Sequence, residues 1–235
     1  MIAYPSGTPS WVDLSSPDPD ASRRFYGSLF GWERAGTFTK GGAEVAGLSP
    51  GKPPVWTTYI AVDDVAAVKS RIEAAGGATV TNGSASAVFT DAEGACFAVW
   101  QSDRHRGAQV VNAPGALTMN ELRTRDLDRA SSFYGEVLGW EVVPIEQGGE
   151  VVYASVKLEG RLIAGMLPLE ATHPHWIPYF GAHDVEATAA KTQELGGEAL
   201  SGPVVVPAGR FVALRDQHGA AFMVLEGEYD PPPGA

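Results

Sequence analysis

The sequence predicts an α+β protein made of two tandem halves that repeat one order of strands and helices. Two observations predict it: an internal repeat, and an alternation of helical and period-two apolar spacing inside each half. With 44% hydrophobic and 19% charged residues, the 235-residue chain has the composition of an ordinary globular protein. Its length alone allows one large domain or two small ones, on a prior of roughly 150 residues per domain.

The repeat is clearest in a nine-residue segment rich in aromatic side chains. Residues 25–33 read Phe-Tyr-Gly-Ser-Leu-Phe-Gly-Trp-Glu, and residues 133–141, 108 positions later, read Phe-Tyr-Gly-Glu-Val-Leu-Gly-Trp-Glu. Further matched landmarks follow in the same order at offsets of 120 and then 125, the last being Asp91 with Asp216. Growing offsets in an unchanged order indicate duplication with small loop insertions.

The two halves meet near residues 106–115, after a polar stretch. We predict a first domain over residues 1–110 and a second over residues 111–235. Each half, at roughly 115 residues, is long enough to bury a core of its own.

The first half opens with a strand and a helix. Residues 11–15 alternate like a half-buried strand. Asp18 and Pro19 then supply an N-cap and a first-turn proline, and helical spacing continues until Gly31 offers a C-terminal stop. Phe25, Tyr26 and their counterparts Phe133 and Tyr134 are expected in the core. Two short strands are predicted next, at 32–37 and 43–48.

A second unit repeats this order within the first half. A strand is predicted at 56–62, and a helix from Asp63 or Asp64 to the glycine pair at 76–77. Strands at 85–90 and 95–101 follow, joined by a turn. Because the second half repeats these landmarks, the sequence predicts four successive β-α-β-β-β units.

Charge and cysteine content exclude several classes of partner. With 17 Lys and Arg against 28 Asp and Glu, the net charge is −11, which repels nucleic acids and anionic membranes. The single cysteine, Cys96, excludes an intrachain disulfide and fits a reducing compartment. We expect no leader peptide, and no apolar run approaches the roughly 18 residues of a membrane span. We therefore expect a cytoplasmic protein.

These units and motifs resemble the vicinal oxygen chelate superfamily, which contains glyoxalase I, bleomycin-resistance proteins and extradiol dioxygenases. The resemblance rests on the repeated segment at 25–33 and on three phrases at 7–14, 59–65 and 120–122. The resemblance extends over nearly the whole chain, with one copy of the pattern in each half. The chain is similar to tandem two-domain actinobacterial members described as hydroxylases or glyoxalase-like proteins. The resemblance implies that each pair of units forms a cup-shaped mixed sheet whose concave face holds the ligand.

The resemblance also implies positions for a divalent metal. Catalytic members of the superfamily hold it on a His of the first strand, a His of the fifth and a Glu of the last. These positions fall on Asp13, Thr57 and Gln101 in the first half, and on Glu121, Ile177 and Glu226 in the second. We expect no metal or other cofactor. Two carboxylates, Glu121 and Glu226, leave Mg²⁺ as the alternative, whereas a transition metal needs the missing histidine.

His175 is the one plausible substitute ligand among the five histidines, because it lies two residues before Ile177 on the same strand face. The alternative is that His175 lines the mouth of the pocket or bonds to a loop.

Strand alternation groups the residues expected to bind a ligand in the cups. With Gln101, His175 and Arg210, they are Trp11, Asp13, Thr57, Tyr59, Met119, Arg123, Ile177 and Tyr179. Trp56 and Trp100 alternate with the ligand positions of their strands, so they are expected to face away from the cup and pack beneath the helices. Aromatic and thioether surface with one carboxylate at its base suits a small organic molecule.

Glu121 and Glu226 are the candidate catalytic pair. In one apolar cup without metal, repulsion and desolvation would raise the pKa of one of them and make it a general acid or base. Alternatively, Arg123, two residues from Glu121, neutralises it in a structural ion pair. Arg210, which has no counterpart in the first half, suggests that the second cup receives a polar or anionic ligand group.

Two functions follow. The first is a metal-free protein that binds a hydrophobic or aromatic metabolite or antibiotic. The second is an enzyme, a glyoxalase-like lyase or a hydroxylase-related oxidoreductase, that uses Glu121 and Glu226. We expect a pseudo-symmetric monomer because one chain carries both cups, with a homodimer as the alternative.

Overall fold

Four units follow one another in the computed structural model, which describes residues 2–101, 106–169 and 173–229. Three have the predicted order β-α-β-β-β, and the fourth has one additional short strand, β15. The first half contains β1 (Pro9–Ser16), α1 (Pro19–Phe30), β2 (Glu33–Ala35), β3 (Thr37–Lys40), β4 (Ala43–Pro50), β5 (Val55–Val62), α2 (Val65–Ala74), β6 (Ala78–Thr81), β7 (Ser86–Thr90) and β8 (Cys96–Gln101). The second half contains β9 (Leu117–Thr124), α3 (Leu127–Leu138), β10 (Glu141–Gln147), β11 (Glu150–Leu158), β12 (Arg161–Pro168), β13 (His175–Gly181), α4 (Val185–Glu194), β14 (Glu198–Ala199), β15 (Val204–Val206), β16 (Gly209–Arg215) and β17 (Ala221–Gly227). The predicted α+β class is confirmed.

The first helix begins and ends at the predicted residues. The Asp18 side chain accepts a hydrogen bond from the Ala21 N–H, and Gly31 ends the helix with a φ of 71°. Asp126 and Gly139 do the same for α3. The four helices have 10 or 12 residues. Within the described residues, none is long and apolar enough to cross a membrane.

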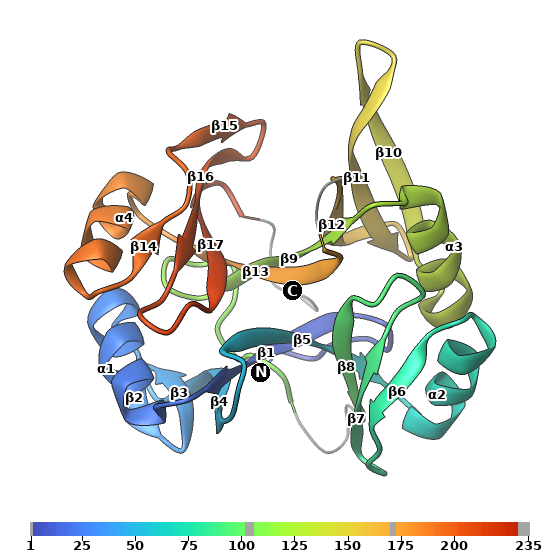
Figure 1. Ribbon diagram of the computed structural model, residues 1–235, viewed down its shortest axis with the longest axis horizontal. Coiled ribbons are helices and arrows are strands. Elements are labelled where there is room, and N and C mark those ends of the chain that lie inside the picture. Colours follow the sequence, from blue (N-terminus) through green and yellow to red (C-terminus); the bar gives the residue numbers. More distant parts are fainter. Residues whose placement is uncertain (1, 102–105, 170–172, 230–235) are drawn as a thin grey trace.

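Each half supplies one curved, mixed sheet (Figure 1). The strand order is β2-β3-β4-β1-β5-β8-β7-β6 in the first sheet and β10-β11-β12-β9-β13-β17-β16-β14 in the second, where β15 also pairs with β16. In both sheets the two central strands are antiparallel, and each has a parallel strand beside it. The concave face of each sheet is the predicted cup.

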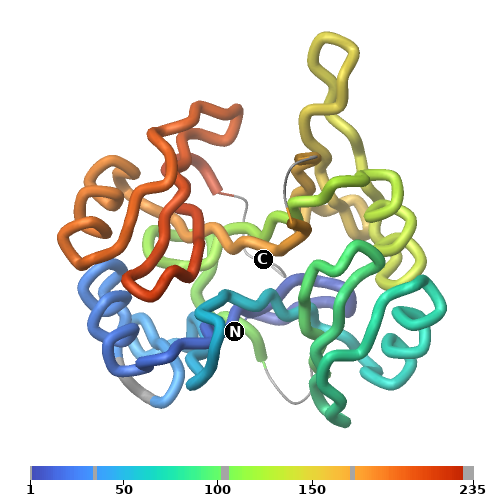
Figure 2. Tube along the Cα trace, in the orientation of Figure 1, coloured from blue at the N-terminus to red at the C-terminus, as the bar shows by residue number. Residues whose placement is uncertain are grey.

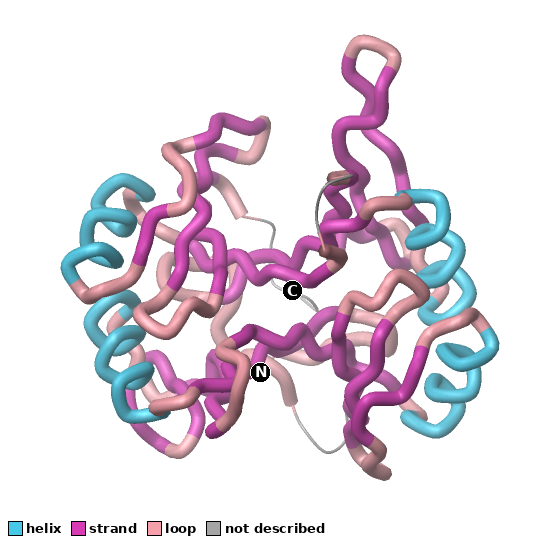
Figure 3. The backbone as a smooth tube through the Cα atoms, viewed as in Figure 1, coloured by secondary structure: helices cyan, strands magenta, loops and turns pink. Residues whose placement is uncertain are grey.

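The helix-side cores are shared between the halves. Figure 2 shows the first unit beside the fourth and the second beside the third, and Figure 3 shows the helices paired at two sides of the molecule. One core joins Phe25 of α1 to Phe222 of β17, and the other joins Phe97 of β8 to Phe133 of α3. Neither half therefore encloses its helix-side core alone.

The repeated aromatic segment joins the halves. Tyr134 donates a hydrogen bond of 3.0 Å to the Asp91 carboxylate and accepts one of 2.8 Å from Trp176. At the other contact between the halves, or seam, where the first unit meets the fourth, Tyr26 makes the same pair of contacts with Asp216 and Trp56. Both tyrosines are fully buried, as predicted.

Candidate functional site

Alternate residues of the central strands face the two cups, as the period of two predicts. In the first cup Trp11 lies opposite Tyr59 across β1 and β5. In the second, Tyr179 lies opposite Met119, and Ile177 lies opposite Glu121.

The first cup is filled by the chain itself. Trp11 and Trp100 are 2% and 7% exposed, and their ring centroids lie 5.8 Å apart. Tyr59 packs against Trp100 at a centroid distance of 5.3 Å. The segment between the halves adds the fully buried Ala108, whose carbonyl accepts a 2.7 Å hydrogen bond from the Tyr4 hydroxyl. An aromatic ligand would therefore compete with the protein's own side chains here.

Asp13 lies on the face of the first cup, opposite Thr57. Its carboxylate accepts a 2.9 Å hydrogen bond from Ser49, and a Cβ at Gly47 on the neighbouring strand would overlap it. Burial raises the pKa of Asp13 despite the Ser49 hydrogen bond. Burial, and then the Asp13 charge, raise the pKa of Tyr59 to about 12. The Asp13 carboxylate is therefore held by the Ser49 hydroxyl of the protein itself.

The second cup holds a buried carboxylate among polar partners. Glu121 is 2% exposed and accepts a 2.8 Å hydrogen bond from the Tyr179 hydroxyl. Arg123 Nε lies 3.3 Å from the other oxygen, so the predicted ion pair is confirmed. Burial nevertheless raises the pKa of Glu121, outweighing Arg123 and the hydroxyl donors. Burial and the Glu121 charge also raise the pKa of Tyr179 well above its ordinary value.

Tyr153 of β11 completes this cluster and was not predicted. Its hydroxyl lies 3.8 Å from Met119 Sδ, and burial and the nearby Glu121 charge raise the pKa of Tyr153 well above its ordinary value. Gly165 makes room for it, because a Cβ there would overlap the Tyr153 hydroxyl. A glycine inside a strand marks a close approach. Gly47 and Gly165 occupy the same place in each repeat. They were the sequence signal that a side chain approaches the strand closely at this point.

His175 lies opposite Arg123 at one end of the second cup. Its Nδ1 lies 2.7 Å from the carbonyl oxygen of His173, and burial lowers its pKa. Arg123 Nη2 also lies 3.6 Å from Met223 Sδ. Of the two interpretations of His175, the bond to a loop is the one that the geometry favours.

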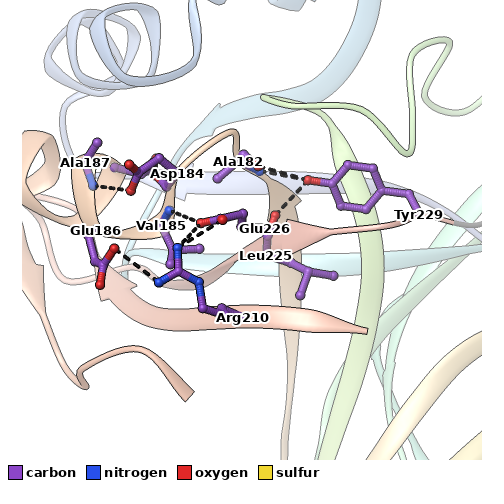
Figure 4. Close-up of polar contacts among 10 residues, drawn as sticks. Ala182, Asp184, Val185, Glu186, Ala187, Arg210, Leu225, Glu226 and Tyr229 are labelled. Atoms are coloured by element: carbon purple, nitrogen blue, oxygen red, sulfur yellow. Dashed lines mark hydrogen bonds and ion pairs between the residues drawn. The ribbon is translucent and has the colours of Figure 1, made fainter. Parts of the chain in front are cut away.

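Glu226 and Arg210 lie on the opposite face of their strands from the cup, so their expected place was wrong. The Glu226 carboxylate accepts hydrogen bonds of 3.0 Å from the Val185 N–H and 2.8 Å from Arg210, at the start of α4 (Figure 4). Arg210 also pairs with Glu186 at 3.2 Å. Arg210 holds the pKa of Glu226 below its ordinary value. Because Met223 faces the cup, strand alternation turns Glu226 away from it.

In the first half, too, the predicted cup residue of the last strand faces away from the cup. Gln101 donates a 3.3 Å hydrogen bond to the Asp63 carbonyl near the start of α2, so its expected place in the cup was also wrong. Trp56 packs in a helix-side core as predicted, whereas Trp100 lies in the cup, which corrects the prediction for it. Ala98 has the same parity as Trp100, so these two residues of β8 face the first cup.

The donors in the second cup do not fit a divalent metal. Glu121 already pairs with Arg123, and the facing strands bring Ile177 and Met223, which offer no hard oxygen or imidazole donor. Across the described ranges, no three His, Cys, Asp or Glu side chains are grouped to hold a metal. The alternative of Mg²⁺ on Glu121 and Glu226 is wrong because the two carboxylates lie on opposite faces of the sheet.

A cavity of about 620 Å³ opens at the other end of the second cup, between β9, β12 and residues 4–9 of the first half. Met119 and Leu225 contribute to its wall and occupy the positions that Trp11 and Trp100 have in the first cup. Smaller side chains thus leave space here that two tryptophans fill in the first half. The cavity is lined by Tyr4, Pro5, Thr8, Pro9, Val111, Asn112, Leu117, Thr118, Met119, Asn120, Leu158, Glu159, Arg161, Leu162, Ile163, Ala164, Ala208, Leu225, Glu228 and Tyr229.

Comparisons with known proteins give a consistent family. Residues 115–224 match the family model of the "Glyoxalase/Bleomycin resistance protein/Dioxygenase superfamily". "Putative glyoxylase CFP32" of Mycobacterium tuberculosis is 37% identical over 95% of this chain and 96% of its own length. "Anthracycline biosynthesis protein DauV" of a Streptomyces species is 36% identical over 96% of this chain and 95% of its own. The Mn(II)-bound glyoxalase of Novosphingobium aromaticivorans has the same fold, with a TM-score of 0.68 and 19% identity over 96% of this chain and 84% of that one.

Proposed function

Because the chain belongs to the glyoxalase, bleomycin-resistance and dioxygenase superfamily, we propose that it binds a hydrophobic or aromatic small molecule in its second cup, without a metal. One observation carries the proposal. The first cup is filled by Trp11, Trp100 and the segment between the halves, whereas the second opens into a cavity of about 620 Å³. Cavities of roughly 300–1,000 Å³ hold drug-sized ligands.

The chemistry of the lining supports an apolar ligand. Leucine, isoleucine, valine and proline side chains make up much of the wall, and the sulfur of Met119 and the ring of Tyr229 suit contact with an aromatic face. Polar and charged side chains also line the cavity and can fix an orientation, among them Asn112, Arg161 and Glu228.

The relatives support a polycyclic aromatic ligand in particular. Two proteins that match this chain over nearly their whole length are named for anthracycline biosynthesis. Anthracyclines are planar polycyclic molecules, of a size that such a cavity accepts.

One observation favours an enzyme as the second candidate. Glu121 is a buried carboxylate with a raised pKa beside the hydroxyls of Tyr153 and Tyr179, which suits it to take a proton from a ligand hydroxyl. Glu226 lies on the opposite face of the sheet and has no part in such a step.

Calorimetric titration with 1,8-dihydroxyanthraquinone tests the binding function. We expect one site per chain and the same affinity with and without a chelator. Met119→Trp, which copies the first cup, should weaken binding at least tenfold, or about 1.4 kcal/mol. Ala208→Trp at the exposed mouth of the cavity is the second variant if Met119→Trp does not fold. Ala66→Trp on the exposed face of α2 is the matched control.

Three results would contradict the proposal: two equal sites, binding that requires an added divalent metal, or an affinity that Met119→Trp and Ala208→Trp leave unchanged.

A further inference from the structure

The segment between the halves enters a wedge in the first sheet. β1 and β4 pair in parallel from Asp13 and Gly47 onward. Before that point a chain segment lies between the two strands: the Ala108 N–H donates to the Ser10 carbonyl at 2.8 Å, and the Gln109 N–H donates to the Glu44 carbonyl at 2.7 Å. The first cup therefore already binds an extended peptide, which belongs to its own chain.

The second sheet has the same wedge at its cavity. β9 and β12 pair in parallel from Glu121 and Gly165 onward. Thr118 and Leu162, at the positions of Ser10 and Glu44 in the first half, both line the cavity. The cavity thus occupies the place where the first sheet holds residues 107–109.

The strand registers support this equivalence. Ser10 and Thr118 each lie at a register shift between the two central strands of their sheet. Glu44 lies opposite Thr39 in its hairpin, and Leu162 lies opposite Lys157 in the matching hairpin, next to an equivalent shift. The backbone geometry that directs two carbonyls at Ala108 and Gln109 is therefore repeated around the cavity.

We propose that the ligand of the second cup carries an extended, peptide-like amide arm, whose N–H groups donate to the backbone carbonyls of Thr118 and Leu162. The inference rests on the proposed function and names a chemical feature of its ligand. Backbone carbonyls are strong acceptors, and a ligand without donors would displace water from them and leave them unpaired. The arm imitates Ala108 and Gln109, and the space that Met119 leaves accepts the apolar body of the ligand.

The probe is a fluorescent, end-capped peptide that copies residues 106–110, Arg-Gly-Ala-Gln-Val. Fluorescence anisotropy should show saturable binding to the full chain. N-methylation of the alanine and glutamine amides of the peptide should weaken it at least tenfold, and so should Met119→Trp. Ala208→Trp replaces Met119→Trp as the blocking variant if Met119→Trp does not fold. Ala66→Trp should bind the peptide like the unchanged chain. The first cup does not compete, because its tethered segment is present at a high effective concentration.

The outcomes separate this inference from the proposed function. Equal affinity for the N-methylated peptide, or no peptide binding, would overturn the amide arm, and 1,8-dihydroxyanthraquinone bound in the same cavity would leave the proposed function standing. Peptide binding without anthraquinone binding would support the amide arm and contradict an aromatic ligand.

Discussion

Glu121 is the residue on which the chemistry of the second cup depends. Tyr179 and Arg123 donate hydrogen bonds to it and Tyr153 lies near it, yet burial still raises its pKa. The folded protein therefore favours the protonated carboxyl, so the contribution of Glu121 to stability is greatest below its unfolded pKa of about 4.3 and is lost as the pH rises through the folded value.

Glu121→Gln should remove this pH dependence, because glutamine still accepts a hydrogen bond from Tyr179 but does not ionise. The stability of the unchanged chain relative to the variant should fall as the pH rises from about 4 through the raised pKa of the folded state, by about 1.4 kcal/mol for each unit by which the pKa is raised. Urea unfolding of both proteins across this range measures it. A difference that grows in favour of the unchanged chain with rising pH would mean that Arg123 outweighs burial.

Glu226→Gln should have the opposite pH profile. Because Arg210, with the Val185 N–H, lowers the pKa of Glu226, the carboxylate stabilises the folded chain above its unfolded pKa, and this stabilisation is lost as the pH falls through the folded value. We expect a lower melting temperature than that of the unchanged chain at neutral pH, a difference that disappears in acid, and unchanged affinity for 1,8-dihydroxyanthraquinone. Weakened binding would place Glu226 in the site.

At the scale of residues, strand alternation predicted the place of Asp13, Tyr59, Glu121 and Tyr179 correctly. It failed in the last strand of each half, where Gln101 and Glu226 had been assigned to the cup. Because side chains alternate with a period of two, an error of one residue moves a side chain to the other face. Tyr153 was missed because its own strand carries no distinctive spacing, and only the glycine opposite it marks the contact.

At the scale of elements, a glycine in β12 gives Tyr153 its place. Gly165→Ala would put a methyl group where the Tyr153 hydroxyl lies, so the ring must turn away from Glu121. We expect a loss of about 1–3 kcal/mol in unfolding free energy. Gly202→Ala, in open space and without a positive φ, is the matched control and should change stability by less than about 0.5 kcal/mol. Equal effects of the two variants would contradict this role of Gly165.

The segment between the halves was predicted only as a boundary. Its role in closing the first cup was not predictable, because it lies outside the repeated units and its contacts are backbone hydrogen bonds that any sequence can make. The strands, helices and caps were predictable because apolar spacing and capping residues act locally.

At the scale of the whole molecule, the halves share their helix-side cores, so we expect them to unfold as one unit. Tyr134→Phe removes a hydroxyl that bonds to Asp91 of the first half and to Trp176 of its own half, and leaves these buried polar groups unpaired. We expect a loss of about 1–3 kcal/mol and a single unfolding transition. Tyr26→Phe at the other seam should behave alike. Two separate transitions, only one of them shifted, would show that the halves unfold independently.

We also propose that the chain works as a pseudo-symmetric monomer, because pairing of the first unit with the fourth and of the second with the third completes both cores within one chain. Light scattering should give the mass of one chain across a wide range of concentration. A concentration-independent dimer would contradict this.

The central claim is that the second cup binds the ligand and the first is closed by the chain itself. A crystal structure of the protein grown with 1,8-dihydroxyanthraquinone tests it most directly. We predict one molecule per chain, packed against Met119, Leu225 and Tyr229, with Trp11 and Trp100 still in contact. Rings bound between Trp11 and Trp100, or a ligand held by a metal at Glu121, would contradict the account.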